Sequence, residues 1–220
     1  MHHDLQIFDG DALVAAAAAR FVATQARQAA DEHSTFTFAV SGGHTPWAMF
    51  AELAHEPMPW EHVVIYQVDE RIAPREDPDR NLTHLLDALG SAPARVVAMP
   101  VEDDDLDGAA DRYAALLPER FDLVHLGLGP DGHTASLVPD DPVLEVTDRL
   151  VAPTGGEYQG RRRMTLTYPA LARADQLLWL ITGADKAAPL QRLMASDTTI
   201  PAGRVTARAS LIIADRAACP

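Results

Sequence analysis

The sequence predicts an α/β fold in which a mostly parallel β-sheet is covered by helices on both faces. Several short runs rich in β-branched residues are apolar nearly throughout, as expected for strands buried on both faces. Helical segments lie between these runs, and strands that alternate with helices at this spacing form right-handed βαβ units. No internal repeat and no long linker divides the chain, so we expect one domain over residues 1–220.

Each expected element has a local signal. The expected strands are residues 35–40, 63–68, 95–99, 123–126, 164–167, 177–181 and 211–213. Asp11 can cap the first, Ala-rich helix, and Pro46 suits the first turn of the second. The expected helices are residues 12–30, 46–53, 82–89, 107–117 and 185–195. The acidic run 102–107 precedes the fourth helix, and we interpret it as a solvated turn whose charge favours a helix N-terminus.

Composition narrows the class of protein. The 220 residues include 18 Lys and Arg against 32 Asp and Glu, a net charge of −14, and 47% of the residues are hydrophobic. This apolar content indicates a folded protein, and the acidity argues against binding to nucleic acid or to anionic lipid. One cysteine, Cys219, cannot form an internal disulfide, the N-terminus lacks signal-peptide features, and no apolar run is long enough to span a membrane. The sequence therefore predicts a cytoplasmic protein.

The first candidate binding segment is residues 41–46, directly after an expected strand. In parallel sheets, ligands bind beyond the carboxyl ends of the strands. The amides of Gly42 and Gly43, the hydroxyls of Ser41 and Thr45 and the start of the next helix together form a candidate phosphate cradle. The alternative is a tight turn that uses glycine only for its backbone angles.

The second candidate segment follows the run 63–68. Asp69 and Glu70 form a carboxylate pair beside Arg71, and such a group can position a polyol and bind an anion. A solvated salt-bridge surface is the alternative.

The third candidate segment is residues 127–139, which contain G-x-G-x-x-G after a strand. A dinucleotide site needs a full crossover helix after the last glycine, whereas Pro139 arrives seven residues later. His133 is instead a candidate general base, and Asp131 two residues earlier could orient its imidazole. A structural histidine is the alternative.

Two basic features remain. Lys186 begins a helix after the run 177–181 and could pair with phosphate, although an exposed helix lysine is the alternative. Arg161, Arg162 and Arg163 form the one dense basic run, which could supply one arginine to an anionic ligand. The sequence contains neither zinc-ligand spacing nor a G-x-S-x-G elbow, so a zinc site and an α/β-hydrolase triad are unsupported.

Together these motifs resemble the 6-phosphogluconolactonase group, whose wider family includes glucosamine-6-phosphate deaminase/isomerase. The matching segments, in order, are residues 41–46, 69–71, 77–82, 127–137, 163–167 and 183–187. The resemblance implies a three-layer α/β/α, Rossmann-like domain that acts on a six-carbon sugar phosphate without metal or organic cofactor.

The third motif separates the two activities of the group. Deaminases of the group carry a glutamate five residues after the motif histidine, whereas this chain has Val138, which cannot exchange a proton. Arg71 also follows the carboxylate pair as in the lactonases. The chain departs from the usual pattern at His44 and at Arg80, and Arg80 is a further candidate phosphate contact.

The resemblance thus implies hydrolysis of 6-phospho-D-glucono-1,5-lactone to 6-phospho-D-gluconate, the second step of the oxidative pentose phosphate pathway. His133, oriented by Asp131, would activate water as general base and then protonate the departing ring oxygen. Arg71, or donors in the 127–132 turn, would stabilise the oxyanion.

The same resemblance assigns the remaining residues and leaves alternatives. The phosphate would lie on the cradle with Arg163 and Lys186 as charge partners, and Asp69 would orient sugar or water. The alternatives are a deaminase/isomerase and a non-catalytic sugar-phosphate sensor. We expect a monomer or small homo-oligomer, with positive groups at the strand-end crevice and the acids elsewhere.

Overall fold

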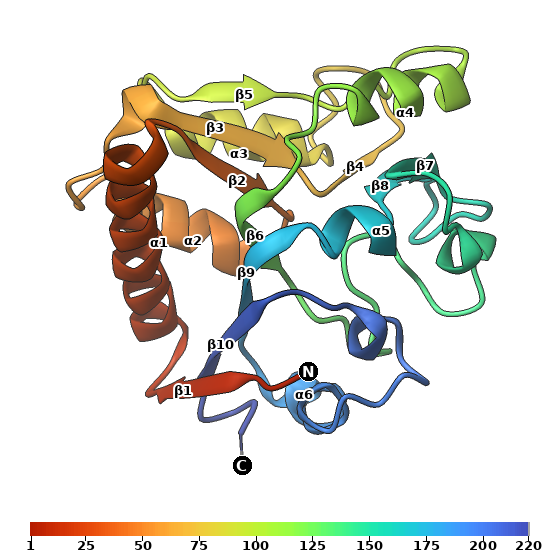
Figure 1. The fold of residues 1–220 in the computed structure, drawn as a ribbon. Coiled ribbons are helices and arrows are strands. Elements are labelled where there is room, and N and C mark those ends of the chain that lie inside the picture. Colours follow the sequence, from red (N-terminus) through yellow and green to blue (C-terminus); the bar gives the residue numbers. More distant parts are fainter. Residues whose placement is uncertain (220) are drawn as a thin grey trace.

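The central element of the protein is a β-sheet (Figure 1). The computed structural model describes residues 1–219, and over that range the sheet has seven strands in the order β1-β10-β9-β6-β2-β3-β5, every neighbouring pair being parallel. The strands are β1 (Asp4–Phe8), β2 (Phe36–Val40), β3 (Val63–Gln67), β5 (Arg95–Val97), β6 (Phe121–Leu126), β9 (Ala174–Ile181) and β10 (Ala209–Asp215). The predicted parallel α/β fold is therefore confirmed.

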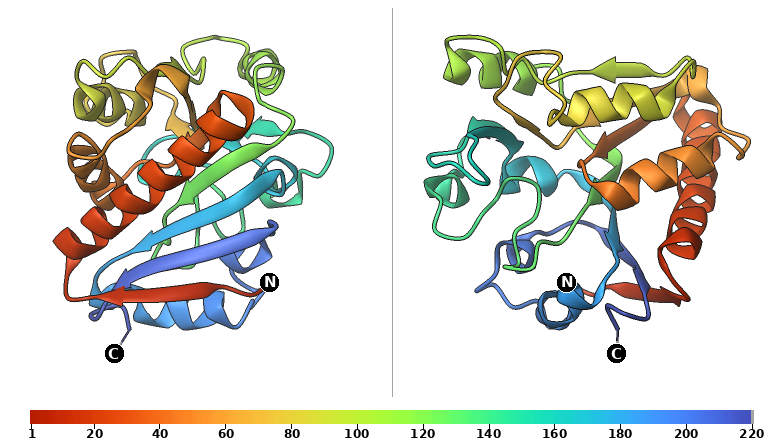
Figure 2. Two further views of the ribbon diagram at one scale, coloured as in Figure 1. Left: turned by 60° about the vertical axis from the view of Figure 1, so that its left-hand side comes forward. Right: turned by 180° about the vertical axis from the view of Figure 1, so that it is seen from behind.

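Helices cover both faces of this sheet, so the molecule has three layers. α1 (Asp11–His33), α2 (His44–Leu53) and α3 (Asn81–Leu89) pack into one apolar cluster with the sheet. α4 (Leu106–Ala114), α5 (Tyr168–Leu171) and α6 (Ala187–Met194) contribute to the cluster on the opposite face. Figure 2 shows α1 lying across its face of the sheet. Many of the buried residues of α1 are alanines, whose small side chains allow this close approach.

A second, antiparallel sheet corrects one of our expectations. It consists of β4 (Asp69–Arg71), β8 (Arg163–Leu166) and β7 (Val151–Pro153), in the order β4-β8-β7. Residues 164–167, which we expected among the parallel strands, therefore belong to this sheet, where Thr165 is opposite Asp69. Its strands are only three or four residues long, and β4 pairs with a strand far away in the chain, so local patterning does not reveal this sheet.

Other differences concern edges and ends. We did not predict β1, because it lies at the edge of the sheet and its residues are mostly exposed, without an apolar run. α1 extends to His33 and stops at Ser34, whose φ of 67° is left-handed. Short 3₁₀ turns occupy Trp60–His62, Pro142–Glu145, Ala184–Lys186 and Pro201–Arg204. Within residues 1–219, no helix is long and apolar enough to cross a membrane.

The topology brings the three candidate loops together. β9, β6, β2 and β3 are neighbours in the sheet, and their carboxyl ends lie at one edge. After β3, the chain passes through Val68 directly into β4, which carries Asp69 into the second sheet. The second sheet thus lies beside the strand ends where the candidate residues emerge.

Candidate functional site

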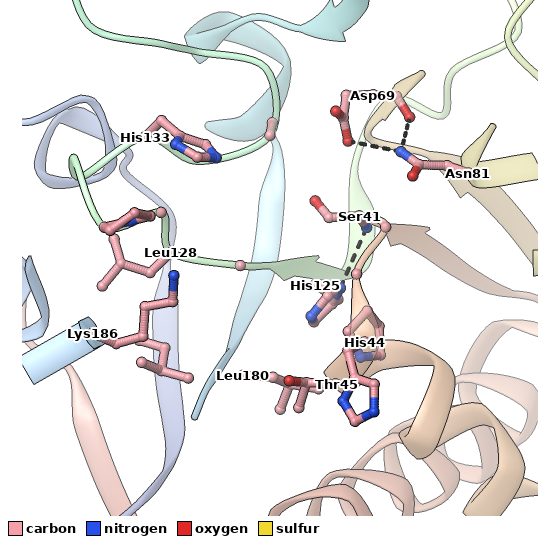
Figure 3. Close-up of a pocket in the computed structure, with 18 of the residues that line it drawn as sticks. Ser41, His44, Thr45, Asp69, Asn81, His125, Leu128, His133, Leu180 and Lys186 are labelled. Carbon is pink, nitrogen blue, oxygen red and sulfur yellow. Dashed lines mark hydrogen bonds between the residues drawn. The ribbon is translucent and has the colours of Figure 1, made fainter. Parts of the chain in front are cut away.

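A cavity of about 480 Å³ lies at the carboxyl ends of these strands. Figure 3 shows His133 and Lys186 on one side of it and Ser41, Asp69 and Asn81 on the other. The predicted residues that line it are Ser41, Gly42, Gly43, Thr45, Asp69, Arg71, His133, Arg163 and Lys186. The last predicted residue, Asp131, lies directly behind His133. The fold therefore gathers most of the candidates around one cavity.

His133 and Asp131 form a hydrogen-bonded pair. The Nδ1 atom of His133 lies 2.5 Å from Oδ1 of Asp131, and the backbone N–H of His133 donates to the same oxygen at 3.1 Å. A carboxylate at Nδ1 favours the tautomer with hydrogen on Nδ1, which leaves Nε2 as a base. Burial alone would raise the pKa of Asp131, but the hydrogen bonds and charge of His133 outweigh it and lower that pKa.

The glycines of this turn make the pair possible. A Cβ on Gly129 would lie 2.0 Å from Nδ1 of His133, so only glycine lets the imidazole lie against the backbone here. Gly132 has a φ of 84°, a left-handed conformation that favours glycine. The amides of Gly129 and Gly132 donate to carbonyls within the turn, those of His133 and Gly129 respectively. The turn therefore serves to hold His133 in place.

Tyr158 and Arg163 form the wall next to His133. The Tyr158 ring lies edge-on to the imidazole, with 4.9 Å between ring centroids, and the Arg163 guanidinium lies 5.3 Å from the centre of the Tyr158 ring. Burial lowers the pKa of Arg163, partly offset by the carboxylate of Asp69. Tyr158 lies in the loop between the strands β7 and β8, and no motif in the sequence pointed to it.

The structure distinguishes the three arginines of the basic run. Arg161 pairs with Asp77 at 2.8 Å, and Arg162 donates to the carbonyl of Thr154. Arg163 alone of the three lines the cavity, because it begins β8 with its side chain turned inward. We expected that one arginine of the run could face a ligand, and Arg163 has that position.

Asp69 lies at the opposite wall and is buried. Its Oδ2 accepts a hydrogen bond from the Ser136 hydroxyl at 2.6 Å and lies 3.9 Å from Nη1 of Arg163. The amide of Asn81 donates to the Asp69 carbonyl at 3.0 Å. Burial raises the pKa of Asp69, and the Ser136 hydrogen bond and the charges of Arg163 and Arg71 offset this only partly. Sequence reasoning did not identify Ser136 or Asn81 as its partners.

Glu70, the other carboxylate of the pair, has a structural role. Glu70 is fully buried and accepts the backbone N–H groups of Arg71, Asn81 and Leu82. Arg80 lies 3.5 Å from Glu70 and 2.9 Å from Glu102 and does not line the cavity. The suggestion that Arg80 contacts phosphate is therefore wrong, since buried and exposed carboxylates hold its guanidinium elsewhere.

The cradle joins β2 to α2. Gly43 precedes α2 with a φ of 135°, and a Cβ on Gly42 would lie 1.9 Å from Oδ1 of Asn81. The Thr45 hydroxyl lies 3.1 Å from that of Thr182, the residue after β9. The backbone N–H of Ser41 donates to Nδ1 of His125 at 3.3 Å, so Ser41 offers the cavity only its hydroxyl. His44 is the exposed first residue of α2 and also lines the cavity.

Lys186 completes the cationic side of the cavity. It is the only lysine in the sequence. It ends the 3₁₀ turn after β9, and its Nζ pairs with Asp185 at 2.9 Å. Gly183, which starts this turn, donates its N–H to Asp215 at the end of β10.

The acidic run 102–107 forms a turn before α4, as expected, since Asp105 caps α4 by accepting the N–H of Gly108.

The arrangement brings a base, cations and hydroxyl groups to one small space. Arg71, Arg163 and Lys186 supply positive charge, and the imidazole of the His133–Asp131 pair lines the same cavity. Over the described residues 1–219, no cluster of three or more histidine, cysteine or carboxylate side chains could hold a metal ion. The site is therefore suited to acid–base chemistry on an anionic ligand.

Comparisons with known proteins show which proteins this chain is similar to. Residues 9–213 match the family described as glucosamine-6-phosphate isomerases/6-phosphogluconolactonase. The 6-phosphogluconolactonase of Synechocystis is 36% identical over 190 residues, 80% of this chain and 78% of the relative. That of Mesorhizobium japonicum is 39% identical over 185 residues, 79% and 77% of the two chains. A crystal structure of a 6-phosphogluconolactonase from Shewanella baltica is 24% identical with a TM-score of 0.89, covers 97% of this chain and 98% of its own, and shows the shared fold.

Proposed function

Because the chain belongs to the glucosamine-6-phosphate isomerase/6-phosphogluconolactonase family, we propose that it hydrolyses 6-phospho-D-glucono-1,5-lactone to 6-phospho-D-gluconate. The observation that carries the proposal is the His133–Asp131 pair beside a cationic cavity large enough for a sugar phosphate. Val138 supports the lactonase over the deaminase, because it places no carboxylate five residues after His133.

His133 acts as the general base in this proposal. Its Nε2 takes a proton from water as the water oxygen attacks the lactone carbonyl, while Asp131 holds the proton on Nδ1 and stabilises the imidazolium. The tetrahedral intermediate then expels the ring oxygen, which receives the proton back from Nε2. The products are a hydroxyl group and a carboxylic acid, and this acid ionises and releases one proton per turnover.

Arg71 is the preferred stabiliser of the oxyanion. The alternative donors, the amides of the 127–132 turn, are partly engaged, because those of Gly129 and Gly132 already donate within the turn. The Arg71 guanidinium lines the cavity and is oriented by its hydrogen bond to Oδ1 of Asn81. A preorganised cationic donor at this position lowers the barrier to attack.

The phosphate binds at the glycine-rich cradle in this proposal. The amides of Gly42 and Gly43 and the hydroxyls of Ser41 and Thr45 surround it at the start of α2, where the helix dipole favours an anion. Lys186 and Arg163 supply charge-assisted contacts. Asp69, whose pKa is raised by burial, orients the sugar hydroxyls or the attacking water.

The test generates the lactone in solution by enzymatic oxidation of glucose 6-phosphate and follows its loss through proton release above the spontaneous rate. The wild-type protein should accelerate this loss, and His133→Ala should reduce kcat by at least about a hundredfold while remaining folded. His55→Ala, which changes an exposed histidine outside the cavity, is the matched control.

Three results would contradict the proposal. A kcat for His133→Ala within about threefold of wild type would remove His133 as the base. Ammonia release from glucosamine 6-phosphate in place of lactone hydrolysis would indicate the deaminase. Binding of 6-phosphogluconate without any turnover would indicate a sensor.

A further inference from the structure

A histidine lies inside the sheet beneath the phosphate cradle. His125 belongs to β6, where its neighbours across the sheet are Val40 of β2 and Leu178 of β9. Both neighbours belong to the apolar cluster on the α1 and α2 face, and His125 itself is 0% exposed. Figure 3 shows its ring directly below Ser41, on the side of Thr45 and Leu180. A leucine or valine would be the ordinary occupant of such a position.

The hydrogen bond to Ser41 defines the state of this histidine. The backbone N–H of Ser41 donates to Nδ1 at 3.3 Å, so Nδ1 carries no proton and the neutral ring carries its proton on Nε2. Burial lowers the pKa of His125 to about 3, so the ring stays neutral near pH 7. His125 is thus a fixed neutral group with one acceptor and one donor.

The donor has no partner. Among residues 1–219, Nε2 of His125 makes no hydrogen bond, and neither does the Ser41 hydroxyl, although both atoms are buried. An unsatisfied buried polar group destabilises a folded protein, and an apolar side chain would avoid that cost. Both residues line the cavity in which we place the phosphate.

We propose that His125 is a positioning residue of the anion cradle, which fixes the Ser41 turn from below and presents its Nε2–H to the floor of the phosphate subsite. This inference deepens the proposed function and rests on it. By holding the Ser41 N–H, His125 directs that amide away from the ligand, so that the Ser41 hydroxyl and the following amides of Gly42 and Gly43 face the cavity. A neutral ring suits this place, because a charged side chain would be desolvated here.

Two substitutions separate the effect of the ring nitrogens of His125, which form hydrogen bonds, from the effect of the space that the side chain fills. His125→Leu fills the space but removes both ring nitrogens, and it should raise KM for the lactone about tenfold or more while kcat changes by less than about threefold. The stabilisation of the protein by inorganic phosphate, measured as the rise in Tm, should be lost. The Tm without phosphate should stay within about 3 °C of wild type, because removing the unsatisfied Nε2 offsets the loss of the Ser41 contact.

His125→Asn is the rescue variant. Its side-chain oxygen can take the place of Nδ1 as acceptor for the Ser41 N–H. We expect it to recover most of the lost KM and of the phosphate-induced rise in Tm. A variant that folds but recovers neither would overturn the positioning role.

His3→Leu is the matched control. His3 is also buried, and its Nδ1 lies 2.7 Å from the Ser210 hydroxyl, but it does not line the cavity. This variant should lower Tm and leave KM and phosphate stabilisation unchanged. If His125→Leu behaves like His3→Leu, His125 is only a structural residue and the inference is wrong.

The outcomes also separate this inference from the proposed function. Lactone hydrolysis by the wild type with an unchanged KM in His125→Leu would refute the inference and leave the function intact. Phosphate stabilisation that depends on His125 in a protein without lactonase activity would refute the function and support the cradle.

Discussion

Asp131→Asn separates the two effects of this carboxylate on His133, orientation and charge. A single oxygen, Oδ1 of Asp131, accepts both the imidazole Nδ1–H at 2.5 Å and the backbone N–H of His133 at 3.1 Å. The amide oxygen of an asparagine in the same place can accept both, because it has two lone pairs. The substitution therefore preserves the tautomer and orientation of the ring and removes only the negative charge.

The charge sets the expected size of the effect. Two unit charges about 4 Å apart attract by about 4 kcal/mol at an effective dielectric constant near 20. The side chain of Asp131 is 38% exposed and that of His133 is 19% exposed, so water screens this attraction in part, whereas fully exposed ion pairs contribute about 1 kcal/mol or less. We expect Asp131→Asn to lose about 1 to 2 kcal/mol of stabilisation of the imidazolium, a decrease in kcat/KM of roughly 5- to 30-fold.

The assay is proton release from lactone generated in solution, compared among Asp131→Asn, Asp131→Ala and wild type. Asp131→Ala also loses both hydrogen bonds to His133, and we expect it to be slower than Asp131→Asn by at least about tenfold. An Asp131→Asn enzyme as slow as His133→Ala would refute the reasoning, because the carboxylate would then do more than orient and stabilise. Equal rates for the asparagine and alanine variants would show that ring orientation does not depend on this residue.

Three further predictions concern binding and stability. Lys186→Met should raise KM for the lactone by about tenfold with a smaller change in kcat. Because Lys186 is the only lysine, pyridoxal 5′-phosphate with borohydride should label its side chain and the α-amino group. Added 6-phosphogluconate should block the labelling of Lys186. Arg80→Met removes the cation between the buried Glu70 and Glu102, so urea unfolding should show a loss of about 3 kcal/mol without a selective change in KM. Burial lowers the pKa of His125 to about 3, from an ordinary value of 6.5. Between these two pH values the unfolded chain binds a proton at this histidine and the folded chain does not. The free energy of unfolding should therefore fall as the pH drops from 6.5 toward 3, by up to roughly 1.4 kcal/mol per pH unit. Urea unfolding at pH 7 and pH 5 should show a smaller acid loss for His125→Leu than for wild type, and an equal loss would assign it to other groups.

The sequence was informative where function and local backbone geometry coincide. Glycine-rich turns after apolar runs indicated the cradle and the His133 turn, because parallel strands present their carboxyl ends at one edge. The runs themselves predicted the strands β2, β3, β5, β6, β9 and β10 of the central sheet. These features depend on short stretches of chain, and the fold adds only their proximity.

The sequence did not predict the location of residues that are positioned by pairing between distant segments. Asp69 and Arg71 read as a polar loop, yet they form β4 through antiparallel pairing with Thr165 and Arg163, almost a hundred residues away. The same pairing turns Arg163 into the cavity, while its neighbours in the basic run contact Asp77 and Thr154. Arg80 was likewise predicted as a candidate phosphate contact, but in the fold its guanidinium lies between the carboxylates of Glu70 and Glu102.

His125 illustrates a different difficulty. In the sequence it is the one polar residue of the apolar run 123–126, and this run correctly predicted a strand. Its importance lies in which face of β6 it occupies and in the turn that folds over it. Neither property follows from the strand assignment, because side chains alternate between faces and only the packed sheet fixes which residue reaches the cradle.

The net charge of −14 can now be reconciled with a site for an anion, because most acids around the cavity are engaged by specific partners. Glu70 accepts three backbone N–H groups beside Arg80, Asp131 holds His133, and Asp215 accepts the N–H of Gly183. Each of these carboxylates has its charge offset by donors that shape the site. Arg163 lies 3.9 Å from Asp69, a carboxyl whose pKa is raised by burial. In this acidic protein the carboxylates near the cavity are engaged by donors of the protein itself, and Arg71, Arg163 and Lys186 line the cavity.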